Sequence, residues 1–162
     1  MEITIIRADE THARFCAESR YEVFRFDKDY TSVKEEFIDI TTRYFMDHRS
    51  DDKQITLVAL DGDKPLGCGT LLIQERLPHI EHYQNLRGYI VNVFVMPTYR
   101  GKGVAKIIMA ALHDEARNRN VIMIDLHAAE KAIPLYRSLG YIHNEYTMEY
   151  DVAAQNDPDS SV

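Results

Sequence analysis

The stretch Val95-Met96-Pro97-Thr98-Tyr99-Arg100-Gly101-Lys102-Gly103-Val104-Ala105 decides the fold. It joins the end of an apolar segment to a glycine-rich turn and then to an apolar helix. The first amides of a helix have no partner inside it, and the helix dipole places about half a positive charge there. Two glycines allow a ligand to approach the backbone closely, and Arg100, Lys102 and Lys106 add charge. Residues 100–105 therefore predict a site for a phosphate or diphosphate.

Other interpretations of this loop exist. The glycines could simply shape a turn at a solvated helix start, and the loop residues alone do not separate that case from an anion site. A P-loop is excluded because Gly103, and not Ser or Thr, follows Lys102. A dinucleotide fingerprint needs a third glycine that is missing, although Asp125 would suit its acidic position.

Outward from this loop, the hydrophobic pattern predicts alternating strands and helices. The expected strands cover residues 3–7, 54–60, 66–74, 88–95, 121–124 and 141–150. The expected helices run from Asp9 or Thr11 to about Phe26, over 33–48, over 103–118, and from about Lys131 to Gly140. Asp61-Gly62-Asp63-Lys64 predicts a tight hairpin turn, and residues 77–87 a loop beside the sheet.

In two of these segments the apolar pattern also predicts which residues are buried. The helix over 103–118 carries apolar residues at helical spacing on one face: Val104, Ile107, Ile108, Ala111 and Leu112. The run at 121–124 is continuously apolar, which is typical of a strand buried on both faces. The second half of the chain therefore predicts two strand-helix-strand units with right-handed crossovers.

Composition narrows the class of protein. The chain has 162 residues, 45% of them apolar, and a formal net charge of -7. An acidic balance argues against a nucleic-acid partner, which requires a basic face. No apolar run approaches the roughly 20 residues that span a membrane, and no secretion signal is visible, so we expect a cytoplasmic address and no membrane partner. Cys16 and Cys68 lack metal-ligand spacing, so the sequence predicts free buried thiols and no metal.

Three motifs carry a resemblance to a known family. Arg100-Gly101-Lys102-Gly103-Val104-Ala105 matches the signature Arg/Gln-x-x-Gly-x-Gly/Ala, and Leu135-Tyr136-Arg137-Ser138-Leu139-Gly140-Tyr141 matches Leu-Tyr-x-x-x-Gly-Phe/Tyr. Val91-Asn92-Val93-Phe94-Val95 is similar to the fourth strand of the same fold. On these motifs the chain resembles the GNAT superfamily of N-acetyltransferases, specifically over residues 89–150 and by element order alone over 3–74.

The resemblance implies an α/β (α+β) fold. It implies one domain over residues 1–152, with a mixed, mostly antiparallel twisted sheet, helices on both faces and a splayed pair of parallel strands. Residues 153–162 have almost nothing to bury and are expected to form a disordered tail.

The resemblance also implies a cofactor site and a catalytic residue. The co-substrate would be acetyl-CoA, held along Val93, Phe94 and Val95, with backbone groups of Val93 and Val95 pairing with its pantetheine arm. Its diphosphate would lie on the amides of the loop Arg100, Gly101, Lys102, Gly103, Val104 and Ala105. Tyr136 would protonate the leaving thiolate, since a tyrosine is protonated at pH 7. One departure is Ala129, where many family members have an asparagine.

The general base and the acceptor are left open. Glu75, Asp125 and His127 are candidates for the base, and Asn92 could orient a water. The acceptor is expected to be a primary amine of a small molecule or peptide, framed by residues 26–31 and 77–87. Transfer is expected to be direct, so that Cys68 is dispensable.

The sequence also leaves two alternative functions and the oligomeric state undecided. The first rival is a non-catalytic sensor that binds acyl-CoA, and the second is a nucleotide-binding α/β protein that uses the same loop. The family resemblance also allows a homodimer.

Overall fold

The computed structural model describes residues 2–25, 28–81 and 83–144. The chain divides into two compact units, Met1–Ala128 and Ala129–Val162. The first unit contains, in chain order, β1 (Ile3–Arg7), α1 (Ala13–Phe24), α2 (Lys34–His48), β2 (Gln54–Asp61), β3 (Lys64–Glu75), β4 (Leu86–Val95), α3 (Val104–Asn118) and β5 (Met123–Leu126). The second unit contains a short 3-10 turn, Glu130–Ala132, and α4 (Ile133–Ser138).

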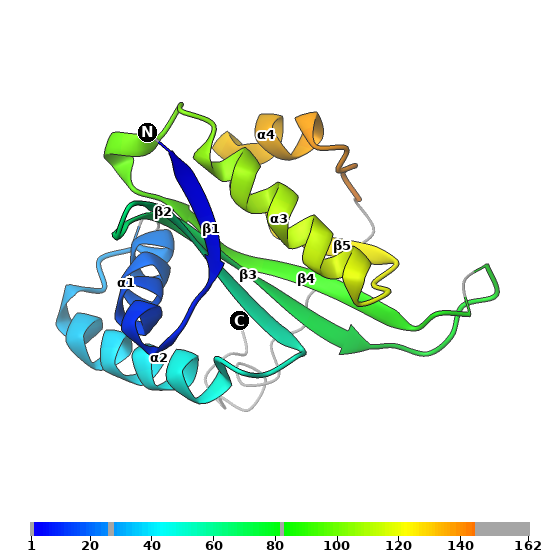
Figure 1. Ribbon diagram of the computed structural model, residues 1–162, viewed down its shortest axis with the longest axis horizontal. Helices are drawn as coiled ribbons and strands as arrows, with labels where there is room; N and C mark the ends of the chain where they lie inside the picture. Colours follow the sequence, from blue (N-terminus) through cyan, green and yellow to red (C-terminus); the bar gives the residue numbers. More distant parts are fainter. Residues whose placement is uncertain (1, 26–27, 82, 145–162) are drawn as a thin grey trace, which may run out of the picture. The chain divides into compact units, whose positions relative to one another are not determined.

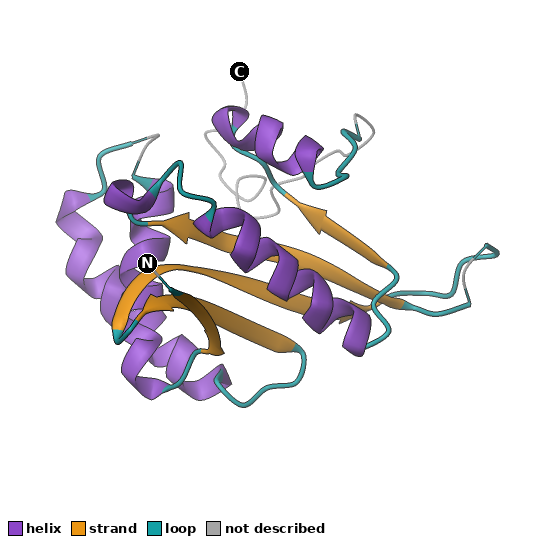
Figure 2. Ribbon diagram, turned by 45° about the horizontal axis from the view of Figure 1, so that its top comes forward, coloured by secondary structure: helices purple, strands orange, loops and turns teal. Residues whose placement is uncertain are grey.

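The described strands form one sheet in the order β1-β2-β3-β4-β5. The first four strands pair antiparallel, whereas β4 and β5 pair parallel. Helix α3 connects β4 to β5 in the sequence, and Figures 1 and 2 show it running across the sheet. The predicted mixed, mostly antiparallel sheet with helices on both faces and one parallel pair is therefore confirmed.

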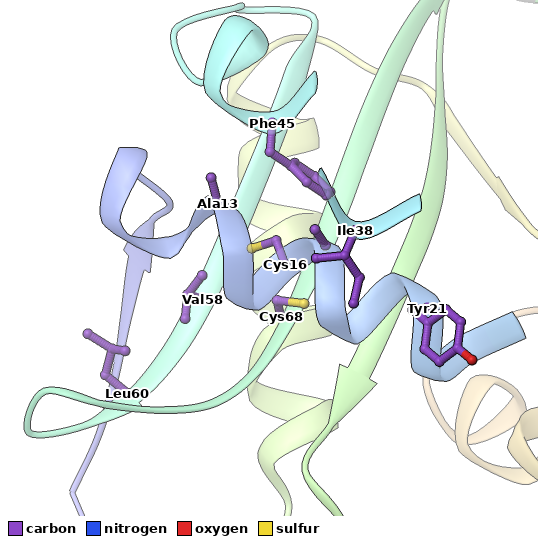
Figure 3. Close-up of a cluster of buried hydrophobic side chains, with 9 residues drawn as sticks. Ala13, Cys16, Tyr21, Ile38, Phe45, Val58, Leu60 and Cys68 are labelled. Atoms are coloured by element: carbon purple, nitrogen blue, oxygen red, sulfur yellow. The ribbon is translucent and has the colours of Figure 1, made fainter. Parts of the chain in front are cut away.

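The two faces of the sheet carry different helices. Neighbouring residues of a strand point to opposite faces, so β3 distinguishes the two sides. Cys68 belongs to the buried cluster around α1 and α2, which Figure 3 shows in close-up. A Cβ on the adjacent Gly67 or Gly69 would instead meet Ile108 of α3. Helices α1 and α3 therefore cover opposite faces.

Most predicted elements are present within a few residues of their expected ends. Strand β4 begins at Leu86 and not at Gly88, so the loop before it is shorter than expected. The hairpin turn lies where it was predicted, between Asp61 and Lys64. Helix α4 starts just after Lys131 and ends before Gly140, also as predicted. Tyr141 to Asn144 are not in a strand, and the rest of the expected strand at 141–150 and the tail at 153–162 lie outside the described residues.

Two burial predictions were wrong. The buried face of α3 consists of Val104, Ile108, Met109, Leu112 and Ala116, whereas Ile107 is 39% exposed. The helix is apolar around much of its circumference, so the sequence allows more than one stripe to face the sheet. The strand after α3 begins at Met123, which is 44% exposed, because β5 is the last strand of the sheet within the described residues.

Gly67 allows β3 and β4 to approach closely beneath α3. A Cβ at this position would lie 2.4 Å from the backbone oxygen of Phe94 and 3.1 Å from Ile108 Cδ1. Replacing Gly67 with alanine should therefore lower the free energy of unfolding by about 3 kcal/mol, since backbone cannot yield as a side chain does. Urea denaturation measures this change.

The matched control is Gly62→Ala in the β2–β3 turn. Gly62 has φ +59°, and a Cβ there would meet nothing within 4 Å. This substitution should cost only the strain of a left-handed alanine, about 1 kcal/mol. Equal losses in the two variants would contradict the crowding of Gly67.

Within the described ranges, no helix has the length and apolar character needed to cross a membrane.

Candidate functional site

A β-bulge interrupts β4 at Asn92. The register between β3 and β4 shifts between Cys68 and Thr70, so that one extra residue of β4 is accommodated there. Asn92 adopts φ 57°, a left-handed conformation that asparagine tolerates better than most residues. Its side-chain Nδ2 donates to the backbone oxygen of Cys16 on α1, at 3.1 Å. The bulge therefore joins β4 to α1.

The bulge also reverses which side chains face each helix. Val93 lies on the α3 side, because a Cβ on Gly69 would meet Val93 as well as Ile108. Phe94 packs against the α1 cluster instead. Without the extra residue these two side chains would exchange faces, so the bulge determines which face of the sheet each of the last residues of β4 points to.

The end of β4 has an open edge. Parallel pairing with β5 ends at Ile90 and Leu126, whereas β4 continues to Val95. Among the described residues, no strand pairs with residues 91–95 on the β5 side. An extended ligand could therefore add to this edge as a further strand does.

Backbone alternation shows which groups face the open edge. The Met96 amide donates to the Leu66 oxygen of β3 at 2.9 Å, so the groups of Val95 and Val93 point the other way. The Val95 oxygen already accepts a hydrogen bond from Arg100 Nε at 3.1 Å. This leaves the Val93 groups and the Val95 amide facing the open edge.

The loop after β4 presents backbone amides. A 3-10 turn, Pro97–Tyr99, follows β4, and α3 begins at Val104. Gly101 and Gly103 have φ +74° and +82°, and a Cβ on either would meet nothing within 4 Å, so the space around both is open. In the part of the chain that the structure describes, no hydrogen-bond acceptor pairs with the amides of residues 101–105. These amides and the positive end of the 15-residue helix α3 together suit an anion.

Cationic side chains surround this loop. Lys64 and Lys102 each place Nζ 5.2 Å from the Tyr99 ring centroid. The hydrogen bond to Tyr99 raises the pKa of Lys64, so this lysine stays charged. The Arg100 guanidinium lies 5.9 Å from the Phe94 ring centroid. Arg100 therefore fastens the loop to the end of β4 in addition to supplying charge.

In the second unit, Tyr136 takes part in the motif that ends α4. The Tyr141 amide donates to the Tyr136 oxygen, and the Gly140 amide to the Arg137 oxygen, both at 3.0 Å. With Gly140 at φ +92°, this is a Schellman motif. The rings of Tyr136 and Tyr141 make the accompanying apolar contact, with centroids 5.7 Å apart. The spacing Leu-Tyr-x-x-x-Gly-Tyr therefore has a structural cause of its own.

The Tyr136 phenol also has the protonation state that a proton donor needs. The side chain is buried, and burial raises the pKa of Tyr136 above its ordinary value. The hydroxyl therefore keeps its proton throughout the neutral range. The ring contact to Tyr141 and this retained proton are compatible with each other, so a structural and a catalytic role do not exclude one another.

The acidic candidates for a general base have partners. Glu75 accepts a hydrogen bond from Asn85 at 3.0 Å. Both oxygens of Asp125 accept hydrogen bonds from Arg87, at 3.0 and 3.2 Å, across the β4–β5 pair. His127 is exposed just beyond β5. The bidentate contact with Arg87 occupies both oxygens of Asp125, whereas the hydrogen bond to Glu75 Oε1 leaves that carboxylate able to accept a proton.

The two cysteines are free and fully buried, as predicted. They lie together between α1 and β3, where Figure 3 shows both side chains inside the cluster. The neighbouring Cys68 thiol and burial raise the pKa of Cys16. Cys68 Sγ contacts the Asn92 backbone oxygen at 3.7 Å. A buried pair of neutral thiols in an apolar cluster is a packing feature.

The bulge and the Arg100 contact were missed by sequence reasoning. Asn92 carried a weak signal, since asparagine within an apolar strand is unusual and tolerates a left-handed backbone. The Arg100–Val95 bond leaves no pattern in the sequence. The bulge joins β4 to α1, and the Arg100 contact holds the end of β4 next to the loop.

Comparison with known proteins agrees with this geometry. The model of the acetyltransferase (GNAT) family matches residues 17–141. A glucosamine 6-phosphate N-acetyltransferase of Trypanosoma brucei brucei is 31% identical over 87 residues, which are 54% of this chain and 57% of that protein. The alignments cover 52–61% of the length of the curated relatives that the chain matches.

Solved structures share the fold along nearly the whole chain. A GCN5-related N-acetyltransferase from Ralstonia eutropha JMP134 is 25% identical with a TM-score of 0.82, over 94% of this chain and 99% of that one. A predicted acetyltransferase from Clostridium acetobutylicum, solved with acetyl-CoA, is 20% identical with a TM-score of 0.81, over 96% and 100%. Because the family model covers most of the sequence, this chain belongs to the GNAT family of acetyltransferases.

Proposed function

We propose that this protein transfers an acetyl group from acetyl-CoA directly to a primary amine of a small molecule or peptide. The observation that carries the proposal is the junction of two features. The open edge of β4 ends in Val95, and the unpaired amides of residues 101–105 follow within a few residues. An extended arm with a diphosphate at one end is complementary to this junction. Family membership supports the same ligand.

The chain's own residues would divide the work as follows. Val93 and the Val95 amide would pair with the pantetheine arm, and the loop amides would bind the diphosphate oxygens. Each charge-assisted hydrogen bond of this kind contributes roughly 1.5–3 kcal/mol. Arg100 would preserve the geometry by holding the loop against β4. Binding would thus place the thioester beside the bulge at Asn92.

The chemical step would be attack of the amine nitrogen on the thioester carbonyl. The carbon–sulfur bond breaks, the amide bond forms, and Tyr136 gives its proton to the departing thiolate. The amine must first lose a proton, and a water path to solvent could accept it. The attacking nitrogen would lose its second proton to the same water path as the amide forms, and Tyr136 would regain a proton from solvent. No covalent enzyme intermediate is needed.

The acceptor is the part of the function with the least support from relatives. The trypanosomal relative acts on glucosamine 6-phosphate, and a yeast relative, 28% identical over 116 residues, is an N-alpha-acetyltransferase. These names include a sugar amine and a peptide amine, so they support a primary amine and nothing narrower. A homodimer stays a prediction.

A coupled free-thiol assay tests the proposal. Acetyl-CoA would be supplied with a panel of amino acids, amino sugars, polyamines, aminoglycosides and peptides. Amine-dependent release of free CoA, with an acetylated product seen by mass spectrometry, is the expected result. Acetyl-CoA that binds without turnover across the panel would overturn it.

One observation favours the sensor as a second candidate. Both oxygens of Asp125, the acidic candidate at the end of β5, already accept hydrogen bonds from Arg87, which disfavours it as a base. A sensor would bind acyl-CoA at the same loop and need no base. The free-thiol assay separates the two candidates.

Cys68 should be dispensable for turnover. Its thiol is buried in an apolar cluster, so a Cys68→Ala variant should lose about 1–2 kcal/mol of stability through a small cavity. Its kcat per folded molecule should stay within twofold of wild type. A folded variant with no turnover would indicate a covalent acetyl-cysteine and would contradict direct transfer.

A further inference from the structure

Arg20 of α1 is a partly buried cation without a counter-charge. Within residues 2–25, 28–81 and 83–144, no carboxylate lies within ion-pair distance of it. Its guanidinium lies 4.8 Å from the Phe24 ring centroid, and this ring holds the group in place without neutralising it. Arg14 on the same helix differs, because it pairs with three carboxylates: Glu18, Glu35 and Asp39.

The position of Arg20 follows from how α1 crosses β4. Cys16 lies against Asn92, and Arg20, one turn later, is in electrostatic range of Tyr89. Helix α1 therefore runs antiparallel to β4. Arg20 lies over the part of β4 where its pairing with β5 ends, at Ile90.

The electrostatic neighbours of Arg20 are two tyrosines, Tyr44 of α2 and Tyr89 of β4, and neither is a carboxylate. Burial lowers the pKa of the Arg20 guanidinium, and the nearby Tyr44 and Tyr89 only partly oppose this effect. An arginine nevertheless remains protonated in proteins, so the positive charge persists.

Unpaired polar atoms accompany this charge on the same helix and strand. Asn92 is 5% exposed, and its Oδ1 is buried with no hydrogen-bond partner among the described residues. Ser19, next to Arg20, is 2% exposed, and its Oγ is likewise unpaired. Buried polar atoms usually have partners. The α1–β4 region therefore combines a cation that has no described counter-charge with polar atoms whose hydrogen-bonding capacity is unused.

We propose that Arg20 binds an anionic group of the acceptor, either a carboxylate or a phosphate, on the α1 face of the sheet. The inference rests on the proposed acetyltransfer and narrows the acceptor to an amine that also carries an anion. The loop that would bind acetyl-CoA begins α3, which covers the opposite face. Acceptor and acetyl donor would therefore reach the end of the β4–β5 pair from opposite sides.

The test compares matched amines in the free-thiol assay. Glucosamine 6-phosphate with glucosamine forms the phosphate pair, and phenylalanine with phenylalaninamide forms the carboxylate pair. The variant is Arg20→Gln, which keeps length and polarity but removes the charge. Arg14→Gln is the control, because it removes an equally charged residue that already has carboxylate partners.

The expected result is a preference of at least tenfold in kcat/KM for the anionic member of one pair. Arg20→Gln should lower that kcat/KM by about tenfold to a hundredfold, chiefly through KM. The kcat/KM for the neutral member and the KM for acetyl-CoA should both change less than threefold in this variant. Arg14→Gln should retain the preference, and the pair that shows it identifies the anion as phosphate or carboxylate.

Other outcomes would overturn the inference. A wild-type enzyme that turns over amines with no preference for an anion, or an Arg20→Gln variant that retains the preference, would contradict it. Calorimetric titration with glucosamine 6-phosphate and with phenylalanine gives a reading independent of turnover. Binding that depends on Arg20 in an inactive wild type would refute the acetyltransfer and retain the anion site, whereas no binding and no turnover would refute both.

Discussion

Replacing Gly103 with valine should weaken acetyl-CoA binding by about a hundredfold or more. Gly103 has φ +82°, a backbone conformation that a β-branched residue avoids. The loop would have to change its path, and its amides would turn away from the diphosphate. Loss of two charge-assisted hydrogen bonds at roughly 1.5–3 kcal/mol each accounts for the magnitude. Calorimetric titration with acetyl-CoA measures the effect.

Gly62→Val is the matched control for this substitution. Gly62 also has a positive φ and open space around it, but it lies in the β2–β3 turn. Both variants should lose similar stability, whereas only Gly103→Val should lose affinity. Wild-type affinity in a folded Gly103→Val protein would show that the loop amides do not bind the diphosphate.

Replacing Tyr136 with phenylalanine should lower kcat by about a hundredfold, the lower range for loss of a general acid. The substitution removes only the hydroxyl. The ring contact to Tyr141 and the Schellman motif remain, so the stability of α4 should be unchanged. The KM for acetyl-CoA should stay within threefold, since the hydroxyl acts on the leaving thiolate. Steady-state kinetics in the free-thiol assay measures both constants.

Tyr141→Phe serves as the control, because it removes the hydroxyl from the other ring of the same pair. Its kcat should stay within about twofold of wild type. Wild-type turnover by Tyr136→Phe would leave Tyr136 with its structural role in the motif alone.

The sequence could predict the elements that depend on strong local patterns. The strand Ile3–Arg7, the helix Lys34–His48 and the turn at Gly62 follow from hydrophobic period and turn chemistry, which act within a few residues. The positive φ of Gly140 was predicted from the sequence, because this glycine directly follows the end of a helix.

Features that depend on distant partners could not be predicted. The stripe of α3 that faces the sheet is set by Gly67 and Gly69 of β3, which let Ile108 approach, and no local pattern contains that information. The exposure of Met123 depends on the position of β5 at the end of the described sheet. The absence of a described carboxylate beside Arg20 depends on how α1 packs against β4, which no local pattern contains.

The candidate site likewise has features that depend on local sequence and features that depend on distant partners. The loop at residues 100–105 is a continuous segment, so its chemistry follows directly from its amino-acid sequence. The open edge of β4 is a property of two strands, since it arises where Leu126 ends the pairing. The bulge at Asn92 depends on the register with β3. Sequence therefore predicted where an anion could bind, whereas the structure was needed to show the strand edge beside it.

A crystal structure of the complex with acetyl-CoA tests the central claim most directly. The account predicts diphosphate oxygens within about 3.2 Å of the amides of residues 101–105, and the pantetheine arm beside Val93 on the open edge of β4. Phosphates bound elsewhere on the protein, with these amides left in contact with solvent, would contradict it.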